Sequence, residues 1–156
     1  MRTFRGYRMQ QEKAISPDGH FLLSGPPGTK LVANTDGAYL QEFSMGGSAY
    51  LELSLRQEGG SFQLQAVVAG EHRYRSDLGT DFSNVYIEGY YRGELQGRSR
   101  SMDSVGDGTL YQYPFCLDTL LGKQVDQVRI YFTAGENTPL DAFNLFSFTI
   151  ATGARQ

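Results

Sequence analysis

The sequence predicts an all-β protein, an antiparallel β-sandwich of the jelly-roll type with about 8–10 short strands. Several segments alternate apolar and polar residues with a period of two, as a strand with one buried face does. Turn-forming glycine and proline pairs separate these segments at short intervals. The 156 residues also include 19 glycines, 10 tyrosines and 10 phenylalanines. Abundant glycine with abundant aromatic residues is typical of short strands joined by tight turns.

The clearest alternation covers residues 50–56, where leucine occupies every second position. A similar alternation follows in residues 62–66, after a connection that contains Gly59 and Gly60. Two alternating segments on either side of a Gly-Gly pair predict an antiparallel hairpin.

Further alternating segments cover residues 85–92, 127–133 and 146–150. Weaker strand candidates, separated by turn signals, are residues 21–24, 30–33, 39–44, 97–102 and 110–115, and residues 118–121 are a candidate for a short helical turn. Each strand has one apolar face, so each of two sheets should bury one side. A chain of this length predicts one domain, which we place at residues 4–152.

Composition excludes several classes of function. The net charge of -3 argues against a nucleic-acid-binding protein, which usually carries a basic patch. One cysteine and two histidines are too few for a disulfide framework or a Cys/His zinc site. No apolar segment approaches the ~20 residues that span a bilayer, so we expect no membrane partner. The chain has no secretory signal, which leaves the compartment open, and it would be extracellular as an excised module.

No cofactor is expected, with structural calcium as the open alternative. Residues 101–108 carry two carboxylates and several other oxygen ligands. They do not match the spacing of the helix–loop–helix calcium site.

The candidate binding site consists of side chains that point away from the core on the alternating strands. Phenol rings, planar amides, guanidinium groups and carboxylates are the groups that recognise sugars, through ring packing and paired hydrogen bonds. The same side chains could instead stabilise the sheet through cross-strand pairs, without any ligand. The predicted set is Tyr50, Glu52, Arg56, Gln63, Gln65, Tyr86, Glu88, Tyr90, Arg92, Gln127, Arg129 and Tyr131.

Residues 49–56, 125–132 and 143–150 resemble the strands of jelly-roll carbohydrate-binding modules and galactose-binding-like domains. The resemblance implies a sandwich closed by the final strand. It also implies a non-catalytic module that recognises a glycan chain or short sugar on the outward face of one sheet. Such modules often use an exposed tryptophan, and this chain has none, which favours single glycan chains or short sugars.

Two other functions stay open. The domain could be a structural or protein-interaction component of an appendage, a virion or another assembly, within a multidomain protein or an oligomer. It could also be a small glycan-active enzyme that uses Glu52 and Glu88. Glycosidases need two carboxyl groups about 5–5.5 Å apart for retention, or roughly 6.5–9.5 Å apart for inversion. That chemistry requires both glutamates to face one groove.

Overall fold

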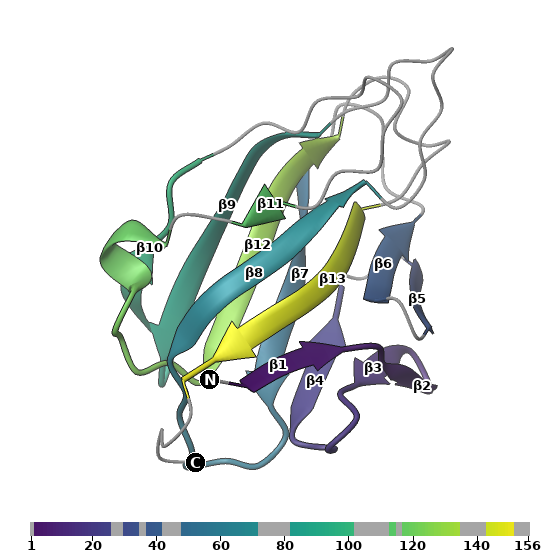
Figure 1. The fold of residues 1–156 in the computed structure, drawn as a ribbon, viewed down its shortest axis with the longest axis horizontal. Coiled ribbons are helices and arrows are strands. Elements are labelled where there is room, and N and C mark those ends of the chain that lie inside the picture. The colour runs from purple at the N-terminus through teal and green to yellow at the C-terminus, as the bar shows by residue number, and fades with distance from the viewer. Residues whose placement is uncertain are drawn as a thin grey trace.

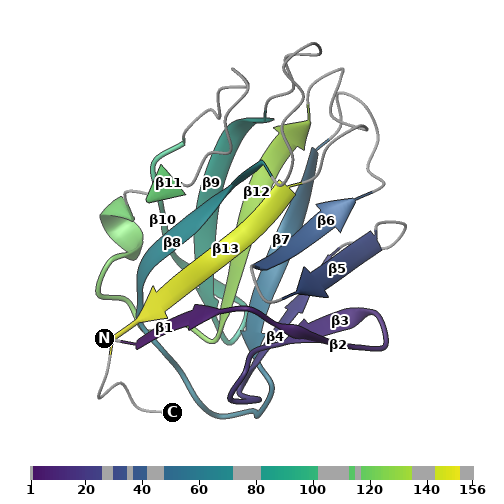
Figure 2. The same cartoon turned by 45° about the vertical axis from the view of Figure 1, so that its right-hand side comes forward.

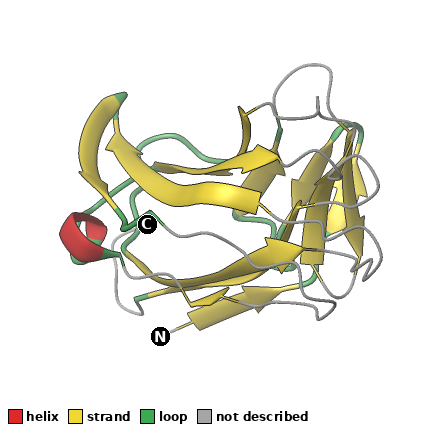
Figure 3. Ribbon diagram, turned by 90° about the horizontal axis from the view of Figure 1, so that it is seen from above, coloured by secondary structure: helices red, strands yellow, loops and turns green. Residues whose placement is uncertain are grey.

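The computed structural model describes residues 2–25, 30–34, 37–41, 48–71, 82–101, 113–114, 117–134 and 143–151. Within these residues, the strands form two antiparallel sheets that pack face to face (Figures 1 and 3). The prediction of an all-β antiparallel sandwich is confirmed, whereas the jelly-roll strand order stays a prediction. Among the described residues, no helix has the length and apolar character needed to cross a membrane.

One layer is a seven-stranded sheet in which all neighbours are antiparallel (Figure 2). It contains the long strands with the strongest sequence alternation at its centre and short strands at its edges. Its order is β10 (Glu94–Arg98), β9 (Phe82–Tyr91), β12 (Gln127–Ala134), β7 (Ser48–Leu55), β4 (Phe21–Ser24), β3 (Lys13–Ile15) and β2 (Arg8–Gln10).

The second layer is a six-stranded sheet that lies in front of the first in Figure 1. The long strands β8 and β13 form its centre and pair with each other. Its order is β11 (Tyr113–Pro114), β8 (Leu64–Glu71), β13 (Phe143–Ile150), β6 (Gly37–Gln41) and β5 (Lys30–Asn34), and β1 (Arg2–Arg5) also pairs with β13. A 3₁₀ turn, η1 (Asp118–Leu120), packs beside β10.

The core lies between the two layers and contains an aromatic cluster near the end of the sandwich where β7 finishes. Phe21 of β4 packs edge-on against Phe62 and Phe148, with ring centroids 5.1 Å and 5.0 Å apart. Phe4 of β1 stacks on Phe148 at 4.8 Å. Because these rings come from both layers, their burial fixes the position of one sheet on the other.

The predicted hairpin is wrong, because β7 and β8 lie in different layers. Residues 56–63, which we call the crossing loop, pass from one sheet to the other. A tight hairpin usually has a loop of about 2–5 residues, so this connection is too long for one. Phe62 anchors its far end, since the ring is buried and its backbone N–H donates to the Val125 carbonyl at 2.8 Å. Gly59, with φ of 90°, supplies the left-handed conformation that the loop requires.

Most of the other predicted strands are present, with bounds that differ at their ends. Residues 21–24 form β4 as predicted, and the helical turn predicted over residues 118–121 is η1. The strand predicted over residues 97–102 instead runs Glu94–Arg98 and pairs with β9. The predictions over residues 39–44 and 110–115 lie partly outside the described residues. Strands β1, β2 and β3 were not predicted, because their short, charged segments lack a clear apolar alternation.

Candidate functional site

Three neighbouring strands, β9, β12 and β7, bring most of the predicted residues to one face of the seven-stranded sheet. Alternate residues on these strands, such as Ile87, Val128 and Leu53, are buried in the core, so the predicted side chains point away from it. We call this outer surface the polar grid, because the strand register aligns it in three rows. They are the end row of Tyr90, Gln127 and Ser54, the central row of Glu88, Arg129 and Glu52, and the tyrosine row of Tyr86, Tyr131 and Tyr50.

The charged side chains of the central row form two ion pairs across the strands, one of them with Arg98 of β10. Arg129 Nε donates to Glu52 Oε1 at 3.1 Å, and Arg98 Nε of β10 donates to Glu88 Oε2 at 2.9 Å. Positive and negative charges therefore alternate across β10, β9, β12 and β7. Sequence analysis missed Arg98, because its segment, residues 97–102, was only a weaker strand candidate and the predicted site was drawn from the strongly alternating strands.

Glu88 is the most enclosed charge of the grid, with only 7% of the residue exposed. Its carboxylate accepts a hydrogen bond from the Tyr90 hydroxyl at 2.5 Å in addition to those from Arg98. Burial alone would raise the pKa of Glu88, but these hydrogen bonds and the charge of Arg98 outweigh it and place the pKa below its ordinary value. The carboxylate is therefore ionised at neutral pH.

The tyrosine row is packed against itself. The rings of Tyr86 and Tyr131 stack at 5.0 Å between centroids, and Tyr50 lies tilted against Tyr131 at 5.5 Å. The guanidinium groups cover further ring faces, with Arg98 over Tyr86 at 5.1 Å and Arg129 over Tyr50 at 4.7 Å. These contacts stabilise the sheet through stacking and cation–π attraction. The ring faces engaged in these contacts are not available for packing against a sugar.

The two glutamates considered for catalysis share this face, and both are held in ion pairs. Arg129 stands between Glu52 and Glu88 in the register, and both carboxylates are engaged in ion pairs. A glycosidase needs one carboxyl group with a raised pKa to act as the general acid. The pKa of Glu88 is lowered, which argues against Glu88 as that acid.

Four of the predicted residues are not part of the polar grid. Gln65 lies on β8 in the six-stranded sheet, and Gln63 precedes that strand at the end of the crossing loop. Arg56 follows the last residue of β7, and Arg92 lies in the tight turn between β9 and β10. The prediction grouped Gln63 and Gln65 with the others because residues 62–66 show the same alternation. However, β8 belongs to the six-stranded sheet, so its polar face lies on the opposite side of the sandwich from the polar grid.

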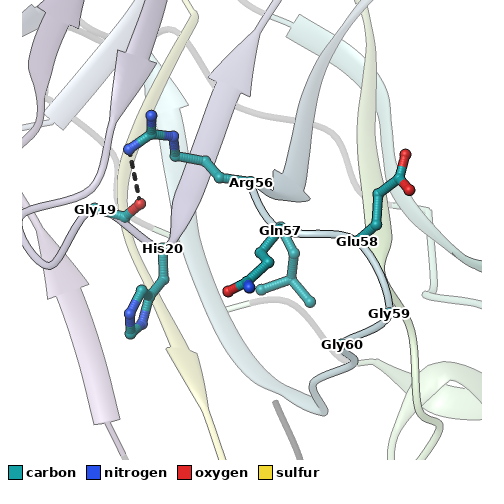
Figure 4. A pocket seen from close by; sticks show the side chains of 8 residues that line it. Gly19, His20, Arg56, Gln57, Glu58, Gly59 and Gly60 are labelled. Atoms are coloured by element: carbon teal, nitrogen blue, oxygen red, sulfur yellow. Dashed lines mark hydrogen bonds between the residues drawn. The ribbon is translucent and has the colours of Figure 1, made fainter.

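Two hollows flank the crossing loop at the end of the sandwich beside the end row. The first, which we call the grid hollow, has a volume of about 610 Å³ and is lined by Ser54 and Gln127, by the crossing loop, and by Arg92 and Asp126. The second, the turn hollow, has a volume of about 540 Å³ and is shown in Figure 4. Both volumes fall in the range of about 300–1,000 Å³ that is typical of small-molecule sites.

The grid hollow differs from the central row in that several of its side chains are unpaired among the described residues, although Asp126 Oδ2 accepts the Arg92 backbone N–H at 3.1 Å. Within the described part of the chain, the side chains of Gln57, Glu58 and Gln127 make no hydrogen bond or ion pair. The Arg92 guanidinium lies over the Tyr91 ring at 5.3 Å and has no carboxylate partner among the described residues. The hollow therefore offers amide, carboxylate and guanidinium groups to a ligand at no cost in broken internal bonds.

No group of three or more histidine, cysteine, aspartate or glutamate side chains suited to a metal occurs among the residues that the structure describes. The calcium candidate, residues 101–108, lies outside those residues except for Ser101. No protein-family model, curated protein or solved structure matches the chain.

Proposed function

We propose that the protein is a non-catalytic carbohydrate-binding module that holds a glycan chain or short sugar in the grid hollow, against the end row of the polar grid. The observation that carries the proposal is the set of unpaired polar groups in a hollow of about 610 Å³. Vicinal sugar hydroxyls are bound by planar groups with two donors or acceptors, and Gln127 and Arg92 are groups of this kind in the grid hollow.

The remainder of the polar grid supports this role by holding the end row in place. Gln127 precedes Arg129 on β12, and the ion pair from Arg129 to Glu52 joins that strand to β7, which carries Ser54. Recognition would then depend on hydrogen bonds more than on ring stacking, since rings of the tyrosine row are engaged with each other. This mode of binding suits a chain that has no tryptophan.

A glycan array followed by calorimetry of the strongest neutral sugar tests the proposal. Gln127→Ala should weaken binding about tenfold, because it removes the hydrogen bonds of one amide from the hollow. Gln65→Ala is the matched control, since it removes the same side chain from the other layer and should leave affinity unchanged. Failure of the folded protein to bind any glycan, or an equal effect of the two variants, would contradict the proposal.

A protein-interaction domain is the second candidate, and the composition of the polar grid favours it. Tyrosine and arginine are enriched at the energetic centres of protein interfaces, and the charges of the central row balance when Arg98 is counted with them. A partner would then cover the tyrosine row. Sedimentation at increasing concentration tests the simplest case, a second copy of the chain. In that case Tyr131→Ala would lower the association constant, whereas Gln127→Ala would have the smaller effect.

A further inference from the structure

The two hollows adjoin each other along the crossing loop. Leu55, Gln57, Glu58, Gly59 and Gly60 line both of them. Figure 4 shows Gln57 extending toward His20, on the side of the turn hollow, whereas Glu58 points away from these two residues, to the other side of the loop. The loop thus presents one polar side chain on each side. It has no side chain at Gly59 and Gly60, where its backbone is open to approach.

The far wall of the turn hollow is held by hydrogen bonds to the turn between β3 and β4. Arg56 donates from its guanidinium to the Gly19 carbonyl at 3.1 Å, as Figure 4 shows, and from its backbone N–H to the His20 carbonyl at 2.9 Å. Asp18 in the same turn accepts the His20 N–H at 3.0 Å and pairs with Arg2 at 3.1 Å. The wall is therefore fixed before any ligand arrives, which lowers the entropic cost of binding.

We infer that the site takes a linear oligosaccharide of at least two units, with one unit in the grid hollow and the next in the turn hollow. The inference rests on the proposed carbohydrate-binding function and adds the substrate class and a second subsite. Each hollow is of a size for one small ligand, and both carry donors and acceptors of the kind that bind sugar hydroxyls. His20 and Arg56 belong to the turn hollow alone, so they should sense only the second unit.

Calorimetry with sugars of one, two and three units from the gluco, manno and xylo series tests the inference. For the series that binds, the disaccharide should bind at least fivefold more tightly than the monosaccharide. His20→Ala should leave monosaccharide affinity unchanged and remove most of that gain. Arg56→Ala should act in the same direction, and thermal denaturation of both variants establishes that they are folded.

Gln127→Ala is the matched variant of the grid hollow and should weaken the monosaccharide and the disaccharide by the same factor. Equal affinity for one, two and three units would overturn the second subsite and leave the carbohydrate-binding function standing. The same conclusion follows if His20→Ala and Arg56→Ala both keep the full gain from chain length. Absence of binding to every sugar by the wild-type protein would instead remove the proposed function, and the inference with it.

Discussion

Glu88→Ala should destabilise the protein by about 2 kcal/mol. The carboxylate accepts hydrogen bonds from the Tyr90 hydroxyl at 2.5 Å and from Arg98 Nε at 2.9 Å, although it is almost completely buried. A hydrogen bond to a charged group contributes about 1.5–3 kcal/mol. The Tyr90 bond supplies most of the effect. The Arg98 side chain is 57% exposed and regains water when its partner is removed, so its share is only about 0.5 kcal/mol.

Urea unfolding, followed by circular dichroism and tyrosine fluorescence, measures this change in a chain without tryptophan. Glu94→Ala on the neighbouring strand is the matched control. Its side chain is exposed, so the free energy of unfolding should change by less than about 0.5 kcal/mol. A double-mutant cycle with Arg98→Ala should give a coupling energy of about 0.5–1 kcal/mol. The account of the polar grid is refuted if Glu88→Ala lowers the free energy of unfolding no more than Glu94→Ala does.

Three further changes test other parts of the fold by urea unfolding. Gly97→Ala should lower the free energy of unfolding by about 1–3 kcal/mol, because the new Cβ would lie 2.5 Å from the backbone oxygen of Thr119. Gln96→Ala is the control, and an equal loss of stability in the two variants would contradict this. Tyr7→Phe should raise the free energy of unfolding by about 1 kcal/mol, because the buried hydroxyl has no hydrogen-bond partner among the described residues, and a loss of stability would show that it has one. Burial alone would raise the pKa of Asp18, but its hydrogen bonds and neighbouring cations lower it overall. Asp18 should therefore contribute about 1 kcal/mol above pH 4, allowing for screening of its exposed partners, and lose that contribution as the pH falls through its lowered pKa. Asp18→Asn should be destabilising at pH 7 and nearly neutral at pH 2, and an equal effect at both would argue against the ion pairs.

The sequence carried enough information to predict the strands of the polar grid but not which strands share a layer. In β7, β9 and β12, leucine, valine and isoleucine at every second position identify the buried face, and the polar face follows directly. Alternation looks the same in either sheet, because both layers bury their apolar faces in one core. Gln65 was therefore grouped with Gln127, although the two side chains point out of opposite layers.

The wrong hairpin prediction and the failure to predict the grid hollow have one origin. Gly59 and Gly60 are a strong turn signal, and they favoured the prediction of a hairpin. The connection is longer than a tight hairpin loop, however, and its length suits a passage between layers about 10 Å apart. Once residues 56–63 are recognised as crossing between sheets, Gln57 and Glu58 become wall residues at the end of the sandwich and not the tip of a hairpin. The ring packing of Tyr131 depends on neighbours from two other strands, so no local pattern could predict it.

The central claim is that a glycan binds at the crossing loop and not on the tyrosine row or the other sheet. Mapping of amide chemical shifts by NMR during titration with the tightest-binding oligosaccharide tests it most directly. We expect the largest shifts at the backbone amides of residues 56–63, at Arg92, and at the side-chain amides of Gln57 and Gln127. Largest shifts on β8 and β13, or across β9 and β12 with the crossing loop unchanged, would contradict the claim.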